Sequence, residues 1–421
     1  MDINHLLRGV SCACGKVHTC DIQYVYIEEN AIARLAQICQ ENRDLLLVAD
    51  ENTFGAAGAQ TVAALAGKNI RQVIFSGAEI LVPNEAAIER VQKNLENADL
   101  IVGIGSGVIQ DLCKYVSFQC AVPYVIVATA PSMDGYASNG AAMITDGMKV
   151  TYNAGLPKAI IADTQVLANA PMDMLKAGYG DIIGKFSALN DWKLSRCVND
   201  EYFCDYIYDL TYDQIRRTLD LAGGILKRDT ESIRTLMEAL VIIGILMSFA
   251  GSSRPASGSE HHLSHFFEIT GILSNTAYFA HGIDVAYSTV ITAEIREKLL
   301  AGQFPGSIYR PTDAHLRQKI QEIYGPVADG CMALQNQVGH YANDRAAVYL
   351  EKEAQIRSIL AEMPSSAQIK KMLSLVQLDM DEFYALYGQQ RIRDAVLYAK
   401  DLKDRYTVLW VNYDYYGGNM S

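Results

Sequence analysis

The sequence predicts an α/β N-terminal domain with a parallel nucleotide-binding sheet, followed by an all-helical C-terminal domain. Two observations carry this prediction. Over residues 1–165, short apolar runs alternate with segments of helical periodicity, and from about Pro171 onward long helical patterns dominate. Apolar strands separated by helices are typical of a parallel sheet that is covered on both faces. The predicted domains are therefore residues 1–168 and 169–421.

Six apolar runs rich in β-branched residues are predicted as the strands of the first domain. They are Tyr24–Ile27, Leu45–Ala49, Gln72–Ser76, Leu100–Ile104, Tyr124–Ala128 and Ala159–Ala162. The segments between them have apolar residues at helical spacing, which predicts a covering layer of helices. These segments are Ala31–Glu41, Ala56–Ala66, Glu85–Asn97 and Val108–Gln119.

The second domain is predicted to be helical, with almost no strand-like runs. Its helices are expected at Met174–Ser195, Tyr202–Ala222, Ser232–Phe249, Glu260–Ile269, Ile283–Ala301, Ala314–Tyr324, Cys331–Lys352, Ser366–Lys371 and Leu378–Ala399. The most apolar stretch, Ala239–Ala250, has 12 residues. A membrane-spanning helix needs about 20 residues, so this stretch is predicted to be a core helix and membrane insertion is not expected.

Composition narrows the classes of function. The 36 Lys and Arg against 48 Asp and Glu give a net charge of −12, which argues against a nucleic-acid protein. An anionic small molecule stays compatible, because a local basic pocket fits inside an acidic protein. The nine cysteines are mostly scattered singly and no secretory signal is visible. This pattern predicts reduced thiols in the cytoplasm.

A glycine turn is the first candidate for a ligand site. In DLIVGIGSGVIQD (Asp99–Asp111), a strand runs through Gly105-Ser106-Gly107 into a helix, which suits a pyrophosphate. The spacing departs from strict GxGxxG, so a simple tight turn is the alternative. Asp50 ends the second strand, where a carboxylate would accept hydrogen bonds from a ribose and favour NAD over NADP. Its alternative role is a helix N-cap.

Histidines cluster late in the chain. Four of the eight (His261, His262, His265 and His281) fall within 21 residues, and His261 and His265 share a helix face. Two imidazoles and a carboxylate would form a divalent metal site. Asp181, just inside a predicted helix start, is the candidate carboxylate, although a helix acid stabilised by the dipole is the alternative. For the histidines, the alternative is ordinary local packing.

A cysteine-rich segment lies near the N-terminus. CACGKVHTC (Cys12–Cys20) looks like half of a zinc knuckle. No second cysteine pair stands nearby in the sequence to complete it. The sequence therefore leaves the role of this segment open.

Together these motifs resemble the superfamily of dehydroquinate synthases, glycerol dehydrogenases and iron-containing alcohol dehydrogenases. Within it, the chain is most similar to the bacterial sn-glycerol-1-phosphate dehydrogenases. The resemblance covers about Asp50 to Gly282 and is weaker outside it. The motifs that carry it are GSGVIQD (105–111), TAPSMDGYAS (129–138), GYGDIIGK (178–185), RPASGSEHHLSH (254–265) and His281-Gly282.

The resemblance implies a role for each matched residue. Gly105, Ser106, Gly107 and Asp111 would hold the pyrophosphate of NAD, with NADP as the other option. Thr129, Ser132 and Ser138 would contact the rest of the cofactor. Asp181, His261 and His281 would hold one divalent metal per subunit (Zn, Ni or Fe). Asp134 and His265 would be catalytic and contact substrate together with Asp181, and His262 would be incidental.

Two features separate the relatives. Dehydroquinate synthases carry Glu at the position of Asp181, and glycerol dehydrogenases need no phosphate pocket. Arg254 and Lys185 offer cations for a phosphate monoester. For Arg254, a helix cap or an ion pair with an acid is the alternative.

The expected activity is therefore the reversible, NAD(P)H-dependent and metal-assisted reduction of dihydroxyacetone phosphate to sn-glycerol 1-phosphate. Relatives also imply a homodimer and phospholipid precursor synthesis. Three alternatives stay open: a glycerol or other polyol dehydrogenase, a dehydroquinate synthase-type lyase, and an inert module that senses NAD or metal. Net NADH oxidation with a phosphorylated ketone would separate the expected activity from the first two, and the third predicts ligand binding without turnover.

Overall fold

The computed structural model describes residues 3–79, 81–145, 148–304 and 307–417, and the chain divides into two units. Unit 1 comprises Met1–Ile182 and Asp209–Ser253, and unit 2 comprises Ile183–Tyr208 and Arg254–Ser421. Two long helices, α7 (Met172–Asn199) and α8 (Asp205–Leu219), each contribute residues to both units. The single domain boundary at residue 168 stays a prediction.

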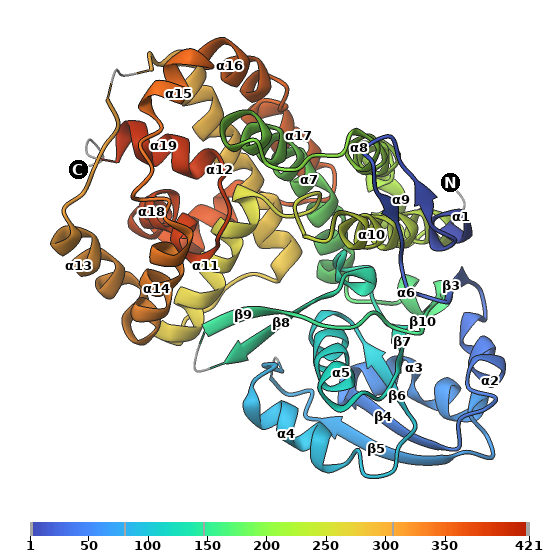
Figure 1. Ribbon diagram of the computed structural model, residues 1–421. Coiled ribbons are helices and arrows are strands. Elements are labelled where there is room, and N and C mark those ends of the chain that lie inside the picture. Colours follow the sequence, from blue (N-terminus) through green and yellow to red (C-terminus); the bar gives the residue numbers. More distant parts are fainter. Residues whose placement is uncertain (1–2, 80, 146–147, 305–306, 418–421) are drawn as a thin grey trace. The chain divides into compact units, whose positions relative to one another are not determined.

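A six-stranded parallel sheet forms the centre of unit 1 (Figure 1). Its strands are β3 (Tyr24–Glu28), β4 (Asp44–Asp50), β5 (Asn69–Phe75), β6 (Leu100–Gly105), β7 (Tyr124–Ala128) and β10 (Ala159–Asp163). They are ordered β3-β10-β7-β6-β4-β5, and every neighbouring pair is parallel. All six predicted strands are confirmed, and so is the predicted fold class.

Successive residues of β4 face opposite sides of the sheet and belong to two separate cores. Leu45 and Leu47 pack with the layer formed by η1 (Ala31–Arg34), α2 (Leu35–Ile38) and α3 (Glu51–Ala64). Leu46 and Val48 pack with residues of α4 (Glu85–Lys93) and α5 (Gly107–Cys120). A strand buried on both faces needs apolar residues at every position, which explains the unbroken apolar run in this strand.

Within the described residues, the remaining strands form two hairpins, and neither was predicted. The first pairs β1 (Val10–Ser11) with β2 (Val17–His18), and the second pairs β8 (Gly140–Thr145) with β9 (Met148–Asn153). Strands of two residues are too short to show an alternating pattern. The run GAAMIT of β8 contains small residues instead of the branched ones that mark a strand.

The described part of residues 164–417 forms helices and no strands, as predicted. Besides α7 and α8 they are α6 (Thr164–Ala168), α9 (Ala222–Leu226), α10 (Thr230–Ala250), α11 (Ser259–Ser274), α12 (His281–Ala301), α13 (Asp313–Tyr324), η3 (Gly325–Val327), α14 (Ala328–Val338), α15 (Ala346–Glu351), α16 (Glu353–Ala361), α17 (Ser366–Ser374), α18 (Met380–Tyr398), η4 (Ala399–Leu402) and α19 (Val408–Tyr416). Unit 1 also contains α1 (Ile3–Leu7) and η2 (Gly135–Ala137).

Two helical predictions are informative. The single helix predicted over Cys331–Lys352 is wrong, because Gly339 adopts a left-handed conformation (φ 75°) that ends α14. Among the described residues, α10 is long and apolar enough to cross a membrane, and 78% of its most apolar window is buried inside the protein. Burial of that kind is what the core-helix prediction for Ala239–Ala250 requires.

Candidate active site

Three of the predicted cofactor residues, Asp50, Gly105 and Thr129, lie at the carboxyl edge of the sheet in unit 1. Strand β4 has β5 on one side and β6 on the other, so the strand order reverses between β4 and β6. Such a reversal opens the crevice where open α/β sheets bind ligands. Asp50 ends β4 and Gly105 ends β6, on either side of this point. Thr129 follows β7, and its amide donates to the Gly105 carbonyl at 3.1 Å.

Gly105 and Gly107, the two glycines of the turn after β6, are required for different reasons. A Cβ on Gly105 would lie 2.6 Å from Cβ of Ile109, so packing against α5 requires a glycine there. A Cβ on Gly107 would meet nothing closer than Met133 at 3.7 Å, an ordinary contact. Packing within the protein therefore does not explain Gly107. Its position at the N-terminus of α5 suits close approach of a pyrophosphate to the backbone.

Asp50 caps helix α3. Its Oδ1 accepts hydrogen bonds from the amides of Asn52 and Thr53 at 2.9 Å, and Thr53 completes a capping box. The N-cap alternative is thus what the structure shows. The cap uses only Oδ1, so a ribose contact through Oδ2 stays a prediction.

A buried lysine that the sequence analysis missed organises the loop after β7. Lys114 Nζ donates to the carbonyls of Gly135 and Gly140, at 3.0 and 2.8 Å, and contacts Asp111 Oδ1 at 3.3 Å. Ser138 Oγ donates to the Gly135 carbonyl at 3.2 Å, and the Ala142 amide donates to Asp111 Oδ2. Complete burial lowers the pKa of Lys114. The only signal in the sequence was the i, i+3 spacing of Asp111 and Lys114.

Asp181 lies in the third turn of α7 and is fully buried. The alternative of an acid stabilised at a helix N-terminus is therefore wrong. The backbone amide of Asp134 donates to Asp181 Oδ2 at 3.0 Å and orients the carboxylate. One turn earlier, a Cβ on Gly178 would lie 1.8 Å from the Pro131 carbonyl oxygen. Only glycine allows the helix to approach this loop so closely.

The histidines come from two packed helices. His261 and His265 lie on α11, and His281 is the first residue of α12. The rings of His261 and His281 have centroids 5.1 Å apart, and His265 lies 5.6 Å from His281. One ligand atom each from Asp181, His261 and His281 lie within 4.8 Å of one another. Two imidazoles and a carboxylate suit a divalent transition metal.

Partners of the two imidazoles select which ring nitrogen remains for a metal. Glu260 Oε1 lies 2.6 Å from His261 Nδ1 and also accepts from the Gly258 amide at 2.8 Å. Burial raises the pKa of Glu260, against the effects of the Gly258 amide and the Lys185 charge. Ser264 Oγ lies 3.4 Å from His281 Nδ1. With the proton on Nδ1, Nε2 is the ring nitrogen that would bind a metal, as in carboxylate–histidine–metal arrangements.

His262 lies outside this cluster. It is fully buried, and neither ring nitrogen has a hydrogen-bond partner among the described residues. Burial and the nearby charges of Lys403, Arg405 and Arg254 lower its pKa well below the usual value. It is therefore a neutral core residue at neutral pH.

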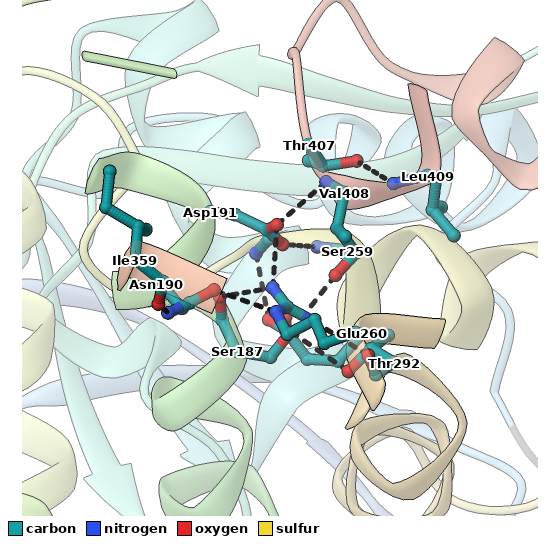
Figure 2. Close-up of polar contacts among 12 residues, drawn as sticks. Ser187, Asn190, Asp191, Ser259, Glu260, Thr292, Ile359, Thr407, Val408 and Leu409 are labelled. Carbon is teal, nitrogen blue, oxygen red and sulfur yellow. Dashed lines mark hydrogen bonds and ion pairs between the residues drawn. The ribbon is translucent and has the colours of Figure 1, made fainter. Parts of the chain in front are cut away.

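The start of α11 is held by a buried polar network (Figure 2). Asp191 accepts hydrogen bonds from the amides of Ser259 and Val408, at 2.7 and 2.9 Å. It also forms a 2.7 Å ion pair with Arg296 of α12. Ser187 of α7 lies 3.0 Å from Ser259, oxygen to oxygen. The network ties α7, α11, α12 and α19 together, which fixes the backbone that carries His261.

The two cations predicted to contact phosphate differ in their partners. Arg254 forms a bidentate ion pair with Glu201, with both N–O distances 2.5 Å, and donates to the Tyr406 carbonyl at 2.9 Å. The ion-pair alternative is thus what the structure shows for Arg254. Lys185 is fully buried on α7, and its charge acts on Glu260.

Comparison with known proteins places this chain in a family. A sequence model of the iron-containing alcohol dehydrogenases matches residues 26–171. The chain is 34% identical to a glycerol-1-phosphate dehydrogenase [NAD(P)+] of Halalkalibacterium halodurans over 323 residues, which covers 72% of this chain and 81% of the relative. It is 30% identical to the protein of that name from Bacillus licheniformis over 413 residues, covering 95% and 91%.

Solved structures agree on the fold. The maleylacetate reductase of Rhizobium sp. strain MTP-10005 is 14% identical, with a TM-score of 0.60, and the match covers 94% of this chain and 96% of that one. At this identity the likeness concerns the fold alone. From the sequence relatives, the chain belongs to the glycerol-1-phosphate dehydrogenase family and is an oxidoreductase.

Proposed function

We propose that this enzyme reduces dihydroxyacetone phosphate to sn-glycerol 1-phosphate with NADH or NADPH, reversibly and with the help of one divalent metal. The observation that carries the proposal is the cluster of two buried residues, Asp181 and His261, with the half-buried His281, in a chain whose relatives are named glycerol-1-phosphate dehydrogenases. A reaction that develops negative charge on a carbonyl oxygen needs a positive group in a site shielded from water.

In this proposal Asp181, His261 and His281 hold the metal. When bound, the cation supplies Lewis-acid polarisation of the substrate carbonyl. The backbone amide of Asp134 fixes one oxygen of Asp181, and Glu260 holds the proton on Nδ1 of His261. Both partners orient the ligands before a metal arrives, which reduces the reorganisation that binding requires.

The carboxyl edge of the sheet is the proposed cofactor site. The turn Gly105–Gly107 and the N-terminus of α5 would bind the pyrophosphate through backbone amides. Asp50 would contact the ribose through Oδ2, and Thr129, Ser132 and Ser138 would contact the remaining cofactor. Asp111 would act indirectly, since both of its oxygens hold protein groups.

For the substrate, His265 is proposed to bind a hydroxyl group and to move a proton at a ring nitrogen. Its ring lies beside those of both histidine ligands. Asp134 is proposed as a second substrate contact. The ion pair with Glu201 occupies two nitrogens of Arg254, so we assign the stronger phosphate role to Lys185.

An NADH oxidation assay on metal-stripped enzyme tests the proposal. Dihydroxyacetone phosphate and dihydroxyacetone are compared, each with Zn²⁺, Ni²⁺ or Fe²⁺ added back. We expect a metal to restore activity only with the phosphorylated ketone. Activity with dihydroxyacetone alone would indicate a polyol dehydrogenase instead, and no activity with either would refute the assigned substrate.

Substitutions at the ligands test the metal assignment separately. Asp181→Ala and His281→Ala should abolish turnover and leave NADH binding, measured by fluorescence titration, largely intact. Asp173→Ala on the same helix and His315→Ala on α13 are matched controls, because both residues lie outside the cluster. Near wild-type activity in either ligand variant would contradict the assignment.

We further propose that the enzyme works in the cytoplasm as a homodimer and supplies a precursor of phospholipids. The nine cysteines, present as thiols, suit a reducing compartment. Sedimentation analysis of the purified protein would test the dimer.

A further inference from the structure

The cysteine-rich segment near the N-terminus forms a tight turn within the β1–β2 hairpin. The Cys12 amide donates to the Lys16 carbonyl at 3.0 Å, and the Gly15 amide donates to the Cys12 carbonyl at 3.1 Å. Gly15 has a φ of 87°, which favours glycine. The turn brings the side chains of Cys12 and Cys14 to the side of the hairpin where His18 lies. Two thiols and an imidazole thus converge over seven residues.

His18 is oriented as metal-binding histidines are. It is 1% exposed, and its ring stacks on Phe249 of α10 with centroids 5.3 Å apart. Nδ1 lies 3.1 Å from the Phe249 carbonyl oxygen. Because a carbonyl oxygen only accepts, Nδ1 must carry the proton, and Nε2 is left with a lone pair. Nε2 lies 3.4 Å from the sulfur of Cys14. A hydrogen bond from the distal nitrogen to a carbonyl is the usual outer contact of a histidine ligand.

The fourth donor comes from a distant part of the sequence. Cys204 precedes the first residue of α8, Asp205, and is 1% exposed. One ligand atom each from Cys12, Cys14, His18 and Cys204 lie within 4.8 Å of one another. Donors bound to a tetrahedral zinc lie about 3.5–3.8 Å from each other, given bonds of about 2.3 Å to sulfur and about 2.0 Å to nitrogen. The four atoms therefore need to move little to enclose an ion.

We propose that Cys12, Cys14, His18 and Cys204 bind a structural zinc ion, separate from the catalytic centre. Three thiolates and one imidazole are a common closed set for structural zinc, whereas Mg²⁺ and Ca²⁺ prefer oxygen. All four positions of a tetrahedron are filled by protein, which leaves none for substrate. The catalytic cluster lacks sulfur, so the two sites differ in donor chemistry.

A structural role follows from the dimensions of the hairpin. Its strands have two residues each, and a two-stranded hairpin is marginally stable in water by itself. Zinc binding stabilises the folded hairpin, because the four ligands come together only in the folded protein and the unfolded chain has no such site. The ion would hold the turn between the two strands in place.

Cobalt substitution tests the site, since thiolate-bound Co²⁺ has an intense charge-transfer band in the near ultraviolet that nitrogen and oxygen ligands do not produce. The full-length protein is loaded with one and then two equivalents of Co²⁺. We expect the band in the wild type and in His281→Ala, which lacks a catalytic ligand. We expect it to be lost or reduced by at least a third in Cys14→Ser and Cys204→Ser. Cys197→Ser, a partly exposed cysteine outside the cluster, should retain it.

A second measurement covers the case in which the serine variants fail to fold. Zinc-loaded wild type is titrated with an organic mercurial, and the released zinc is followed with a chromogenic chelator. We expect about one zinc per chain to be released in step with modification of three thiols. A wild type without the charge-transfer band, or zinc release unrelated to thiol modification, would overturn the proposal. A full band in Cys204→Ser would exclude Cys204 as the fourth ligand.

Discussion

Oε1 of Glu260 lies 2.6 Å from Nδ1 of the next residue, His261, and the pair is buried at the start of α11. The carboxylate accepts the imidazole proton, so Nε2 is the nitrogen left for a metal. Adjacent residues on a helix rarely interact through their side chains, because they point about 100° apart. Here Glu260 turns back toward the helix N-terminus, where it also accepts from the Gly258 amide.

Glu260→Gln should therefore weaken metal binding without removing a ligand. Loss of such an outer carboxylate typically costs 10- to 100-fold in metal affinity, so we expect about that change. Competition with a calibrated chelator would measure it. Glu268→Gln, two turns later on α11, is the control and should bind metal as the wild type does. Equal affinity in Glu260→Gln would show that the carboxylate does not support the ligand.

Alanine at Gly107 should affect cofactor binding, whereas alanine at Gly105 should affect stability. Gly107→Ala should fold with near wild-type stability and raise the KM for NADH about tenfold or more, because the new methyl group has room in the protein and would obstruct the pyrophosphate. Gly105→Ala should lower the free energy of unfolding by about 1–3 kcal/mol through its clash with Ile109. Chemical denaturation and steady-state kinetics on both variants provide the test. A normal KM in Gly107→Ala would remove the turn from the cofactor site.

The ion pair of Arg254 and Glu201 should act on stability more than on substrate binding. Arg254→Met or Glu201→Gln leaves a largely buried charge without its partner, and we expect each to cost about 3 kcal/mol of folding free energy. The double variant should cost less than the sum of the two. KM for dihydroxyacetone phosphate should respond alike in the two single variants. A KM raised by Arg254→Met alone would instead indicate a direct phosphate contact.

Asp414 should make stability depend on pH. Burial raises its pKa to about 6, although the Tyr349 hydroxyl donates to its carboxylate at 2.5 Å. The ordinary pKa is about 3.9, so the folded state binds more protons than the unfolded state between about pH 4 and pH 6. Stability from this group is thus full below about pH 4 and is lost as pH rises through about 6. The loss is about 3 kcal/mol at most.

Asp414→Asn is the matching variant, since an amide oxygen still accepts from Tyr349. The difference in unfolding free energy between wild type and Asp414→Asn, measured by urea denaturation, should change between about pH 4 and about pH 7 in favour of the variant. A difference that is constant with pH would mean that Asp414 keeps an ordinary pKa.

Much of the fold could be predicted because its signal is local. The central strands β4, β6, β7 and β10 are buried on both faces, so runs such as Leu45–Ala49 are recognisable by their continuous apolar residues. The hairpin of β8 and β9 gave no such signal. The histidine cluster was visible as a concentration of one residue type, and the resemblance to a family proposed which members are ligands.

The groups that contact and orient the site residues could not be predicted, because these contacts depend on which distant parts of the chain come together in the fold. The amide of Asp134 reaches Asp181 across 47 positions of the sequence, and a backbone donor leaves no trace in residue identity. Lys114 was not singled out from the sequence, and it is completely buried, where it donates to the carbonyl groups of Gly135 and Gly140. Cys204 is 190 positions from Cys14, so the cysteine-rich segment near the N-terminus contained only three of the four members of this cluster.

The contact of Gly178 with the Pro131 carbonyl has a consequence for how this scaffold can diversify. The loop that contains Pro131 also contains Ser132 and Asp134, whereas Gly178 shares its helix with Asp181. The absence of a side chain at Gly178 thus sets the spacing between the loop, which is proposed to contact cofactor and substrate, and the helix, which is proposed to contribute a metal ligand. We therefore expect a change of substrate preference to come from side chains around this fixed backbone and not from position 178.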